Sequence, residues 1–314
     1  MILNRIYYLV KPLLPWRVRI LLRRWRSSRL RLACQHTWPI DEAAGVTPPY
    51  WTGWPHGKQF GFVLTHDVEG AKGFDRVSQL MEVERKYGFR SSFNFVPRGE
   101  YSLSDRMRIN IEQAGFEVGV HGLEHDGKLY SSQTIFSQKA AEIRNYLEKW
   151  KAVGFRSPFM QHRLEWLHEL EAEYDASTFD TDPFEPEPDG AGTIFPFWVD
   201  GPNGRGYVEL PYTLVQDFTL FVILQETTID IWKKKVDWIV SRGGMVLVNV
   251  HPDYIAFQGA PGRDEFPVAL YEEFLAYVKE KYVGQYWSPL PRDVARYFRS
   301  TMTSGCTNDS KRVG

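Results

Sequence analysis

The segment FVLTHDVEG (62–70) places three ionisable side chains at the end of an apolar run that is typical of a buried β-strand. These side chains are His66, Asp67 and Glu69. Packing alone does not explain them, because charged groups are expensive to bury unless they are paired or bound to a metal. An imidazole and two carboxylates at this position could hold a metal ion or transfer a proton.

Other apolar runs also end on an ionisable residue. FEVGV is followed by His121, VGF by Arg156 and MVLVNV by His251. In a barrel of parallel strands and helices, the carboxyl ends of the strands carry the active site, because the loops there gather side chains from different strands. We therefore expect these residues to share one site with the acids of 62–70.

The motif HGLEH places His121 and His125 four residues apart. If this segment forms a helix, both imidazoles share one face and can bind one metal ion. Two imidazoles and one carboxylate leave open positions for water, which is typical of a hydrolytic site. In an extended chain Asp67 and Glu69 point to the same side, so one can bind the metal while the other handles a proton. His66 points to the other side and is predicted to pack behind the site.

Strands and helices alternate over about 240 residues, which predicts a parallel sheet covered by helices and favours a barrel over an open sheet. Gly88 and Gly115 are placed to end two of the helices, and Ser104 to cap the start of one. Residues 175–206 are rich in Pro, Gly and Asp and predict a long irregular excursion. The expected fold class is therefore α/β, with an irregular or incomplete (β/α) barrel.

The first 40 residues contain nine basic residues and no acidic residue, although the net charge of the whole chain is only -1. The segment RVRILLRRWRSSRLRL (17–32) predicts a basic amphipathic helix. Such a helix can rest on an anionic membrane surface, pack on the domain by its apolar face, or contact nucleic acid. The alternation of Leu and Arg favours the membrane surface for residues 1–40, and no nucleic acid is expected as a partner.

The chain is expected to divide into a basic arm (1–45), a barrel (46–300) and a disordered polar tail (301–314). No apolar stretch approaches the roughly 20 residues of a membrane span, and Lys11, Pro12 and Pro15 interrupt the early apolar stretch that a secretory signal would need. Two distant cysteines suit a reducing compartment. We therefore expect a cytoplasmic protein that binds peripherally at the inner face of the membrane.

Five short motifs follow one another along the chain: THDVE (65–69), HGLEH (121–125), RSP (156–158), YDASTFDTD (174–182) and VNVHPD (248–253). In this order they resemble a known family, the polysaccharide deacetylases with the NodB-homology fold (carbohydrate esterase family 4). The resemblance implies a distorted TIM-like barrel of the NodB type. Three further segments, DTDPFEP, VELPYTLVQDFTLF and GGMVLVNVHPDY, resemble a bacterial branch often called WbmS-like, which is found with machinery for surface polysaccharide synthesis.

The resemblance implies a divalent metal held by His121, His125 and one acid of THDVE. Zinc is expected first, and Fe, Co, Ni or Mn also suit such ligands. Asp67 looks like the catalytic base and Glu69 like the metal ligand. However, His66 and Asp67 stand where the family has an adjacent Asp pair, and on that alignment Asp67 is the ligand instead.

The remaining roles are also implied by the resemblance. Arg156 would hold the base carboxylate and His251 would be the general acid, with Asp180, Asp182 and Asp253 as candidates for orienting His251 or binding substrate. The expected function is metal-dependent N-deacetylation of a nucleotide- or lipid-linked N-acetylated sugar in bacterial surface polysaccharide or O-antigen biosynthesis. The alternatives are a small-molecule amidohydrolase on the same scaffold and a catalytically inactive carbohydrate-binding or assembly protein.

Overall fold

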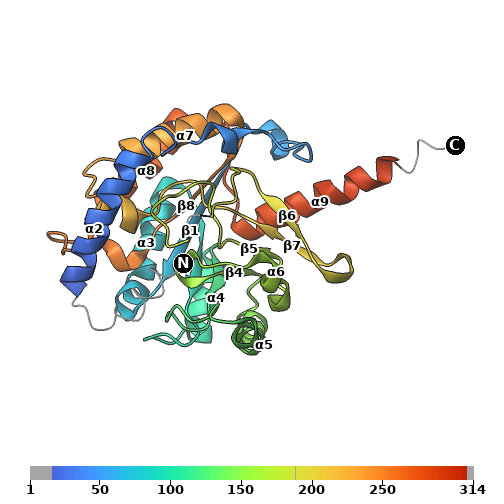
Figure 1. The fold of residues 1–314 in the computed structure, drawn as a ribbon, viewed down its shortest axis with the longest axis horizontal. Coiled ribbons are helices and arrows are strands. Elements are labelled where there is room, and N and C mark those ends of the chain that lie inside the picture. The colour runs from blue at the N-terminus through green and yellow to red at the C-terminus, as the bar shows by residue number, and fades with distance from the viewer. Residues whose placement is uncertain (1–15, 188, 310–314) are drawn as a thin grey trace.

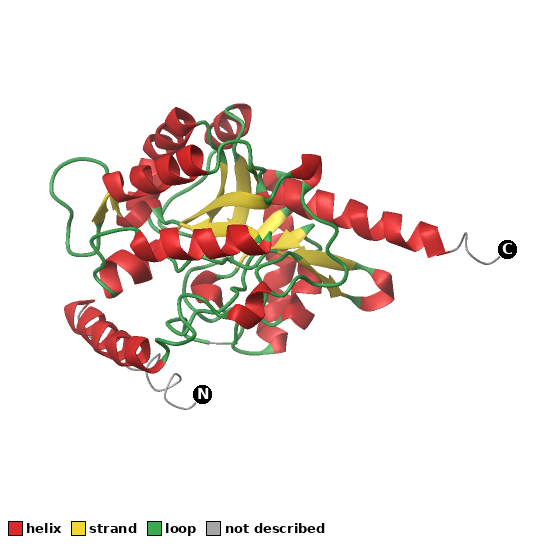
Figure 2. Ribbon diagram, turned by 90° about the horizontal axis from the view of Figure 1, so that it is seen from above, coloured by secondary structure: helices red, strands yellow, loops and turns green. Residues whose placement is uncertain are grey.

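A computed structural model describes residues 16–187 and 189–309 of the 314. The first fifteen residues of the predicted arm and residues 310–314 of the predicted tail lie outside this part. A sheet forms the centre, and helices surround it (Figures 1 and 2). The helices are α2 (Trp16–Ala33), α3 (Ala71–Tyr87), α4 (Asp105–Gln113), α5 (Gln133–Trp150), α6 (Leu164–Leu167), α7 (Asp230–Arg242), α8 (Val268–Lys281) and α9 (Pro291–Asp309).

The main sheet follows the order β11-β1-β2-β3-β4-β5-β7-β6, and β8 pairs with β1. All its pairings are parallel except that of β6 with β7. A two-stranded sheet of β9 and β10 lies apart from it. The strands are β1 (Phe60–Val68), β2 (Ser91–Phe95), β3 (Glu117–His121), β4 (Gly154–Arg156), β5 (Tyr174–Asp175), β6 (Phe197–Asp200), β7 (Gly206–Glu209), β8 (Met245–Asn249), β9 (Ile255–Ala256), β10 (Phe266–Pro267) and β11 (Tyr286–Trp287).

The barrel is incomplete between β8 and β7. Among the described strands β8 pairs with β1 alone, so no strand ladder closes the circle. A short segment after β7 bridges the gap instead, where the amide of Thr213 donates to the Leu247 carbonyl at 2.9 Å and its hydroxyl accepts from the Leu247 amide at 3.0 Å. The expected irregular or incomplete barrel is confirmed.

The helices begin and end where their sequences contain suitable caps. Ser104 caps α4, since its hydroxyl accepts from the Met107 amide, and Ser132 caps α5 in the same way. Gly88 ends α3 and Gly243 ends α7 in the left-handed conformation that glycine adopts without strain. The predicted cap at Ser104 and stop at Gly88 are confirmed.

Alternation along β1 assigns its side chains to two sides of the sheet. Phe60, Phe62 and Leu64 lie in the larger hydrophobic core, which includes residues of the surrounding helices, and Val63 lies in a second core that includes Leu247. By the same alternation, His66 faces the first side while Asp67 and Glu69 face the second. Asp67 at the end of β1 and Glu69 directly after it therefore face the interior of the barrel.

Two segments differ from the expectation. Residues 175–206 include the strand β6, which pairs antiparallel with β7 directly after this segment, so the end of the predicted irregular excursion forms an ordered edge of the sheet. Residues 301–309, predicted to belong to a disordered tail, instead continue α9, which projects from the body of the molecule (Figures 1 and 2). Once a helix is established, each added residue gains a hydrogen bond without a new nucleation cost.

Candidate metal centre

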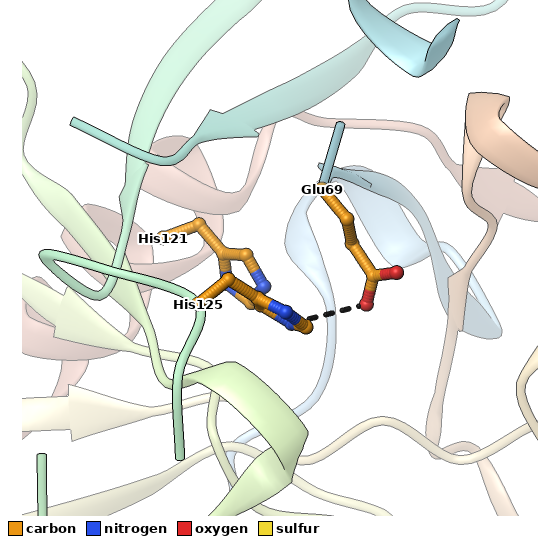
Figure 3. A group of neighbouring side chains, drawn as sticks. All are labelled: Glu69, His121 and His125. Atoms are coloured by element: carbon orange, nitrogen blue, oxygen red, sulfur yellow. Dashed lines mark ion pairs between the residues drawn. The ribbon is translucent and has the colours of Figure 1, made fainter. Parts of the chain in front are cut away.

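Glu69, His121 and His125 converge at the carboxyl ends of β1 and β3 (Figure 3). One ligand atom from each lies within 4.8 Å of the other two. Nε2 of His125 is buried 3.1 Å from Oε1 of Glu69, where it forms an ion pair but no hydrogen bond. Ligand atoms bound at about 2.0–2.2 Å to one tetrahedral ion lie about 3.3–3.6 Å apart, and the 3.1 Å between His125 and Glu69 is close to this spacing.

His121 and His125 reach the site from a strand and a loop, and HGLEH does not form the helix that would have placed both imidazoles on one face. His121 is the last residue of β3, and the residues after it form turns and bends up to the start of α5. Gly122 has φ = 63°, a left-handed conformation that breaks any helical continuation. The two imidazoles meet because the chain turns at Gly122, with their ring centres 5.4 Å apart.

The surroundings of His121 favour the neutral form of its imidazole, which is the form that binds a metal. Its Nδ1 lies 3.1 Å from the carbonyl of Arg156, which fixes the proton on Nδ1 and leaves the lone pair of Nε2 free. Burial lowers the pKa of His121 to about 4, in spite of the opposing charge of Asp67. A neutral imidazole oriented by a backbone carbonyl is a typical metal ligand.

Glu69 stays ionised beside the histidines. Burial alone would raise the pKa of Glu69, but the charge of the nearby His125 outweighs it and holds the pKa well below its usual range. The Tyr254 hydroxyl donates to Oε2 at 2.5 Å, so Oε1 remains available for a metal. Asp253 accepts from the amides of Glu69, Gly70 and Gly73 and thereby fixes the turn that carries Glu69.

Asp67 occupies a separate position next to this triad. Its Oδ1 accepts from the Asn94 amide at 2.9 Å and its Oδ2 from the Asn249 amide at 2.8 Å. Nη1 of Arg156 lies 3.6 Å from Oδ1. Burial alone would raise the pKa of Asp67, but the charges of His121 and Arg156 outweigh it and hold the pKa at about 2. The geometry therefore groups Glu69 with the histidines and Asp67 with the guanidinium.

His251 faces Asp67 and Glu69 from the end of β8, with its Nε2 4.0 Å from one oxygen of each. Its Nδ1 binds Oδ1 of Asp217 at 2.6 Å, and its backbone amide donates to Oδ2 of the same residue. Burial alone would lower the pKa of His251, but the charge and hydrogen bond of Asp217 raise it to about 10. His251 is thus a protonated imidazolium aimed at the site.

The residue that orients His251 is Asp217, which corrects the expectation of Asp180, Asp182 or Asp253. Asp180 is buried in an ion pair with Lys235, and Asp182 accepts from the Tyr212 hydroxyl and the Phe184 amide. Burial raises the pKa of all three carboxyls, which reaches about 8 for Asp182 and about 6 for Asp253. Their predicted role in substrate binding stays a prediction.

His66 lies behind the site, as alternation along the strand predicted. Its Nδ1 binds the Val250 carbonyl at 2.8 Å and its Nε2 binds Glu84 at 2.7 Å. Its ring is fully buried and packs against Phe93. His66 therefore supports the end of β1 from the side opposite the two acids.

Four residues that contact the site were not anticipated: Asn94, Asp217, Asn249 and Tyr254. Asn94 and Asn249 interrupt the apolar strands SSFNF and MVLVN, and this signal was available in the sequence. Asp217 precedes the π-helix η7 (Phe218–Ile223) after a loop and belongs to no regular strand pattern. No periodicity places such a residue, and only the folded chain does.

Known structures share this architecture, although no family model and no curated protein matches the sequence. A protein from Mycobacterium smegmatis described as a polysaccharide deacetylase has a TM-score of 0.58 at 20% identity, over 82% of this chain and 96% of its own. A 4-alpha-glucanotransferase from Thermococcus litoralis has a TM-score of 0.50 at 12% identity, over 76% of this chain and 40% of its own. The first likeness shows that the chain has the fold of the protein described as a polysaccharide deacetylase.

A third structure is a protein from Bordetella bronchiseptica described as a polysaccharide deacetylase involved in O-antigen biosynthesis. It has a TM-score of 0.42 at 16% identity, over 80% of this chain and 93% of its own. A TM-score below 0.5 does not by itself establish a common fold.

Proposed function

We propose that this chain, with its polysaccharide deacetylase fold, is a metal-dependent N-deacetylase of an N-acetylated sugar. One observation carries the proposal. A possible metal triad (Glu69, His121 and His125) lies beside an ionised carboxylate, Asp67, and a protonated imidazole, His251. Hydrolysis of an amide needs these three functions together: activation of water, acceptance of its proton and protonation of the departing amine.

The three residues of the triad would hold the metal. Two imidazoles and one carboxylate suit zinc, and also Fe, Co, Ni or Mn. When bound, a divalent ion lowers the pKa of water and polarises the amide carbonyl as a Lewis acid. The buried Nε2 of His125 supports this assignment, because it forms an ion pair with Glu69 but makes no hydrogen bond within the protein, and a bound metal would satisfy it.

Asp67 would accept the proton of the attacking water. The amides of Asn94 and Asn249 bind its two oxygens, so the carboxylate has a fixed orientation. Arg156 contributes positive charge beside it, which keeps the carboxylate ionised at neutral pH. Arg156 is itself held by the Ala176 carbonyl and the Thr65 hydroxyl.

His251 would donate a proton from Nε2 to the departing amine nitrogen. With a pKa of about 10 it carries this proton over the whole physiological range. Asp217 binds the opposite ring nitrogen and so keeps Nε2 directed at the site before and after the transfer. Asp67 would thus accept the proton of the water, and His251 would donate the proton to the amine.

The substrate would be nucleotide-linked or lipid-linked, as in the synthesis of a bacterial surface polysaccharide or O-antigen. This part of the proposal rests on the resemblance of the sequence motifs. The protein would then work in the cytoplasm or at the inner face of the membrane. Among the described helices, none is long and apolar enough to cross a membrane.

Metal content and acetate release test the proposal together. The purified chain should contain one equivalent of metal and release acetate from at least one member of a panel of N-acetylated sugar donors. His121→Ala and His125→Ala should lose metal and activity, while His36→Ala, which changes an exposed histidine, should keep both. A chain that binds no metal would overturn both hydrolase functions, and hydrolysis of small amides without any sugar would favour the amidohydrolase.

A further inference from the structure

Helix α2 has two faces with different roles. Its inner face packs on the domain: Ile20 is buried against Phe218 and Val222 of η7, and the Arg24 guanidinium donates to the Val222 carbonyl at 2.9 and 3.1 Å. Arg31 forms an ion pair with Glu226. The helix is therefore attached to the body of the protein, at whose edge it lies in both views (Figures 1 and 2).

The outer face of α2 exposes an apolar stripe, which we define as Val18, Leu21, Leu22, Trp25 and Leu32. With 100° between successive residues of a helix, these five side chains fall within an arc of about 100°. Leu21, Trp25 and Leu32 are 63%, 58% and 71% exposed. Only four other large apolar side chains are exposed in the described part of the chain, and they lie on other segments.

The charges around this stripe are all positive. Arg26 and Arg29 are exposed on the same side, and the Arg29 guanidinium lies 4.1 Å from the centre of the Trp25 ring. No acidic residue occurs before Asp41. A helix with exposed Leu and Trp flanked by Arg is typical of segments that lie in the interface of an anionic bilayer, where the apolar side chains enter the acyl boundary and the guanidinium groups meet phosphates.

The inner face of α2 connects this stripe to the candidate active site. Phe218 follows Asp217, the partner of His251, and its ring centre lies 4.5 Å from that of Tyr254, whose hydroxyl binds Glu69. The helix thus packs on η7, next to Asp217, the partner of the proposed general acid, and next to Tyr254, whose hydroxyl binds Glu69.

We infer that the apolar stripe of α2 binds the surface of an anionic membrane and holds the active site beside it. This rests on the proposed function only in one respect, namely that a lipid-linked acetamido sugar would then be presented next to the site. The membrane contact itself requires only the stripe and its arginines.

Cosedimentation of the full chain with vesicles tests the inference. The protein should bind vesicles of phosphatidylcholine and phosphatidylglycerol in a 70:30 ratio. It should bind vesicles of phosphatidylcholine alone at least about tenfold more weakly. A Leu21→Glu/Trp25→Glu double variant should lose at least about tenfold in binding to the anionic vesicles. The matched control, Ile109→Glu/Val283→Glu, changes two exposed apolar residues on other segments and should bind like the wild type.

The metal content of both double variants separates this inference from the proposed function. It should equal that of the wild type, because neither pair of residues contacts the triad. Unchanged vesicle binding by Leu21→Glu/Trp25→Glu would overturn the inference and leave the proposed function intact. The inference is also overturned if the wild type does not bind the anionic vesicles. In that case, a wild-type dimer that Leu21→Glu/Trp25→Glu dissociates would assign the stripe to a second copy of the chain, and wild-type binding to an oligonucleotide would assign it to nucleic acid.

Discussion

His66 and Asp67 are neighbours on β1, but they lead to two buried polar clusters of opposite character. Behind the sheet both ring nitrogens of His66 have partners, and Glu84 accepts from the Ser91 and Tyr271 hydroxyls as well as binding His66. In front of the sheet Nε2 of His125 and Nη2 of Arg156 are buried without a hydrogen-bond partner within the protein.

The difference teaches how to separate structural from functional polar groups. A buried polar group that stabilises the fold is saturated with hydrogen bonds, since each missing bond costs about 1–3 kcal/mol. Buried polar groups that lack a hydrogen bond within the protein instead indicate a site where a ligand binds. Because His66 and Asp67 are adjacent on one strand, mutations of the two clusters can be compared in the same protein.

Asp67→Asn should have the largest effect, on activity alone. The amide cannot accept the proton of water, so we expect deacetylation to fall about 10³-fold. Circular dichroism should show a folded protein, and metal analysis should show unchanged stoichiometry. Loss of the metal would make Asp67 a ligand, and retained activity would show that another group is the base.

His66→Ala should have the opposite profile, with its effect on stability. Removal of the ring leaves Glu84 buried with one partner fewer and opens a cavity, so the free energy of unfolding should fall by about 3–5 kcal/mol. Denaturant titration measures this change, with the exposed His36→Ala as the control. Metal stoichiometry in the folded fraction should not change. A variant that keeps its stability but loses metal would remove the distinction between the two clusters.

The sequence predicted this contrast where local geometry was enough to decide it. Alternation along an extended strand correctly separated His66 from Asp67, and the barrel and its irregularity followed from the order of the elements. The conformation of HGLEH could not be predicted in this way, although His121 and His125 are only four residues apart. His125 reaches the site through a turn at Gly122 because a glycine at the end of a strand can adopt a left-handed conformation, which the spacing of HGLEH does not reveal.

Long-range partners could not be predicted at all. Asp217 lies 34 residues before His251 in the chain and reaches it only because the loop after β7 folds back over β8. The sequence motifs point instead to Asp180, Asp182 and Asp253. Which of several acids contacts a given imidazole depends on the tertiary fold, and composition carries no information about it.

Asp217→Asn should change the pH dependence of the reaction and reduce the rate at neutral pH about 10²-fold. Asp217 raises the pKa of His251 to about 10, so the wild type should keep its acid protonated until the pH approaches that value. Without the carboxylate, the alkaline limb of the activity profile should move to lower pH. An unchanged limb would show that His251 is not the acid.

The same shift predicts how stability depends on pH. The folded-state pKa of about 10 lies above the ordinary value of about 6.5, so protonation of His251 favours the folded state. This contribution is fully present below pH of about 6.5 and is lost as the pH rises to about 10. The loss should be smaller in Asp217→Asn, as thermal unfolding at pH 6 and pH 10 can measure.

The smallest effects should come from a matched pair of tyrosines, one in each cluster. Tyr254 donates to Glu69 in front of the sheet and Tyr271 to Glu84 behind it, at 2.5 and 2.6 Å. Tyr254→Phe frees one oxygen of Glu69, the proposed metal ligand, and should weaken metal binding about 10-fold, as the loss of groups that orient ligands does in other metal sites. Tyr271→Phe should instead lower the free energy of unfolding by about 1 kcal/mol and leave metal affinity unchanged. Competition with a chelator and denaturant titration measure the two quantities on both variants. If both variants lose stability and neither loses metal affinity, the cluster in front of the sheet is as structural as the one behind it.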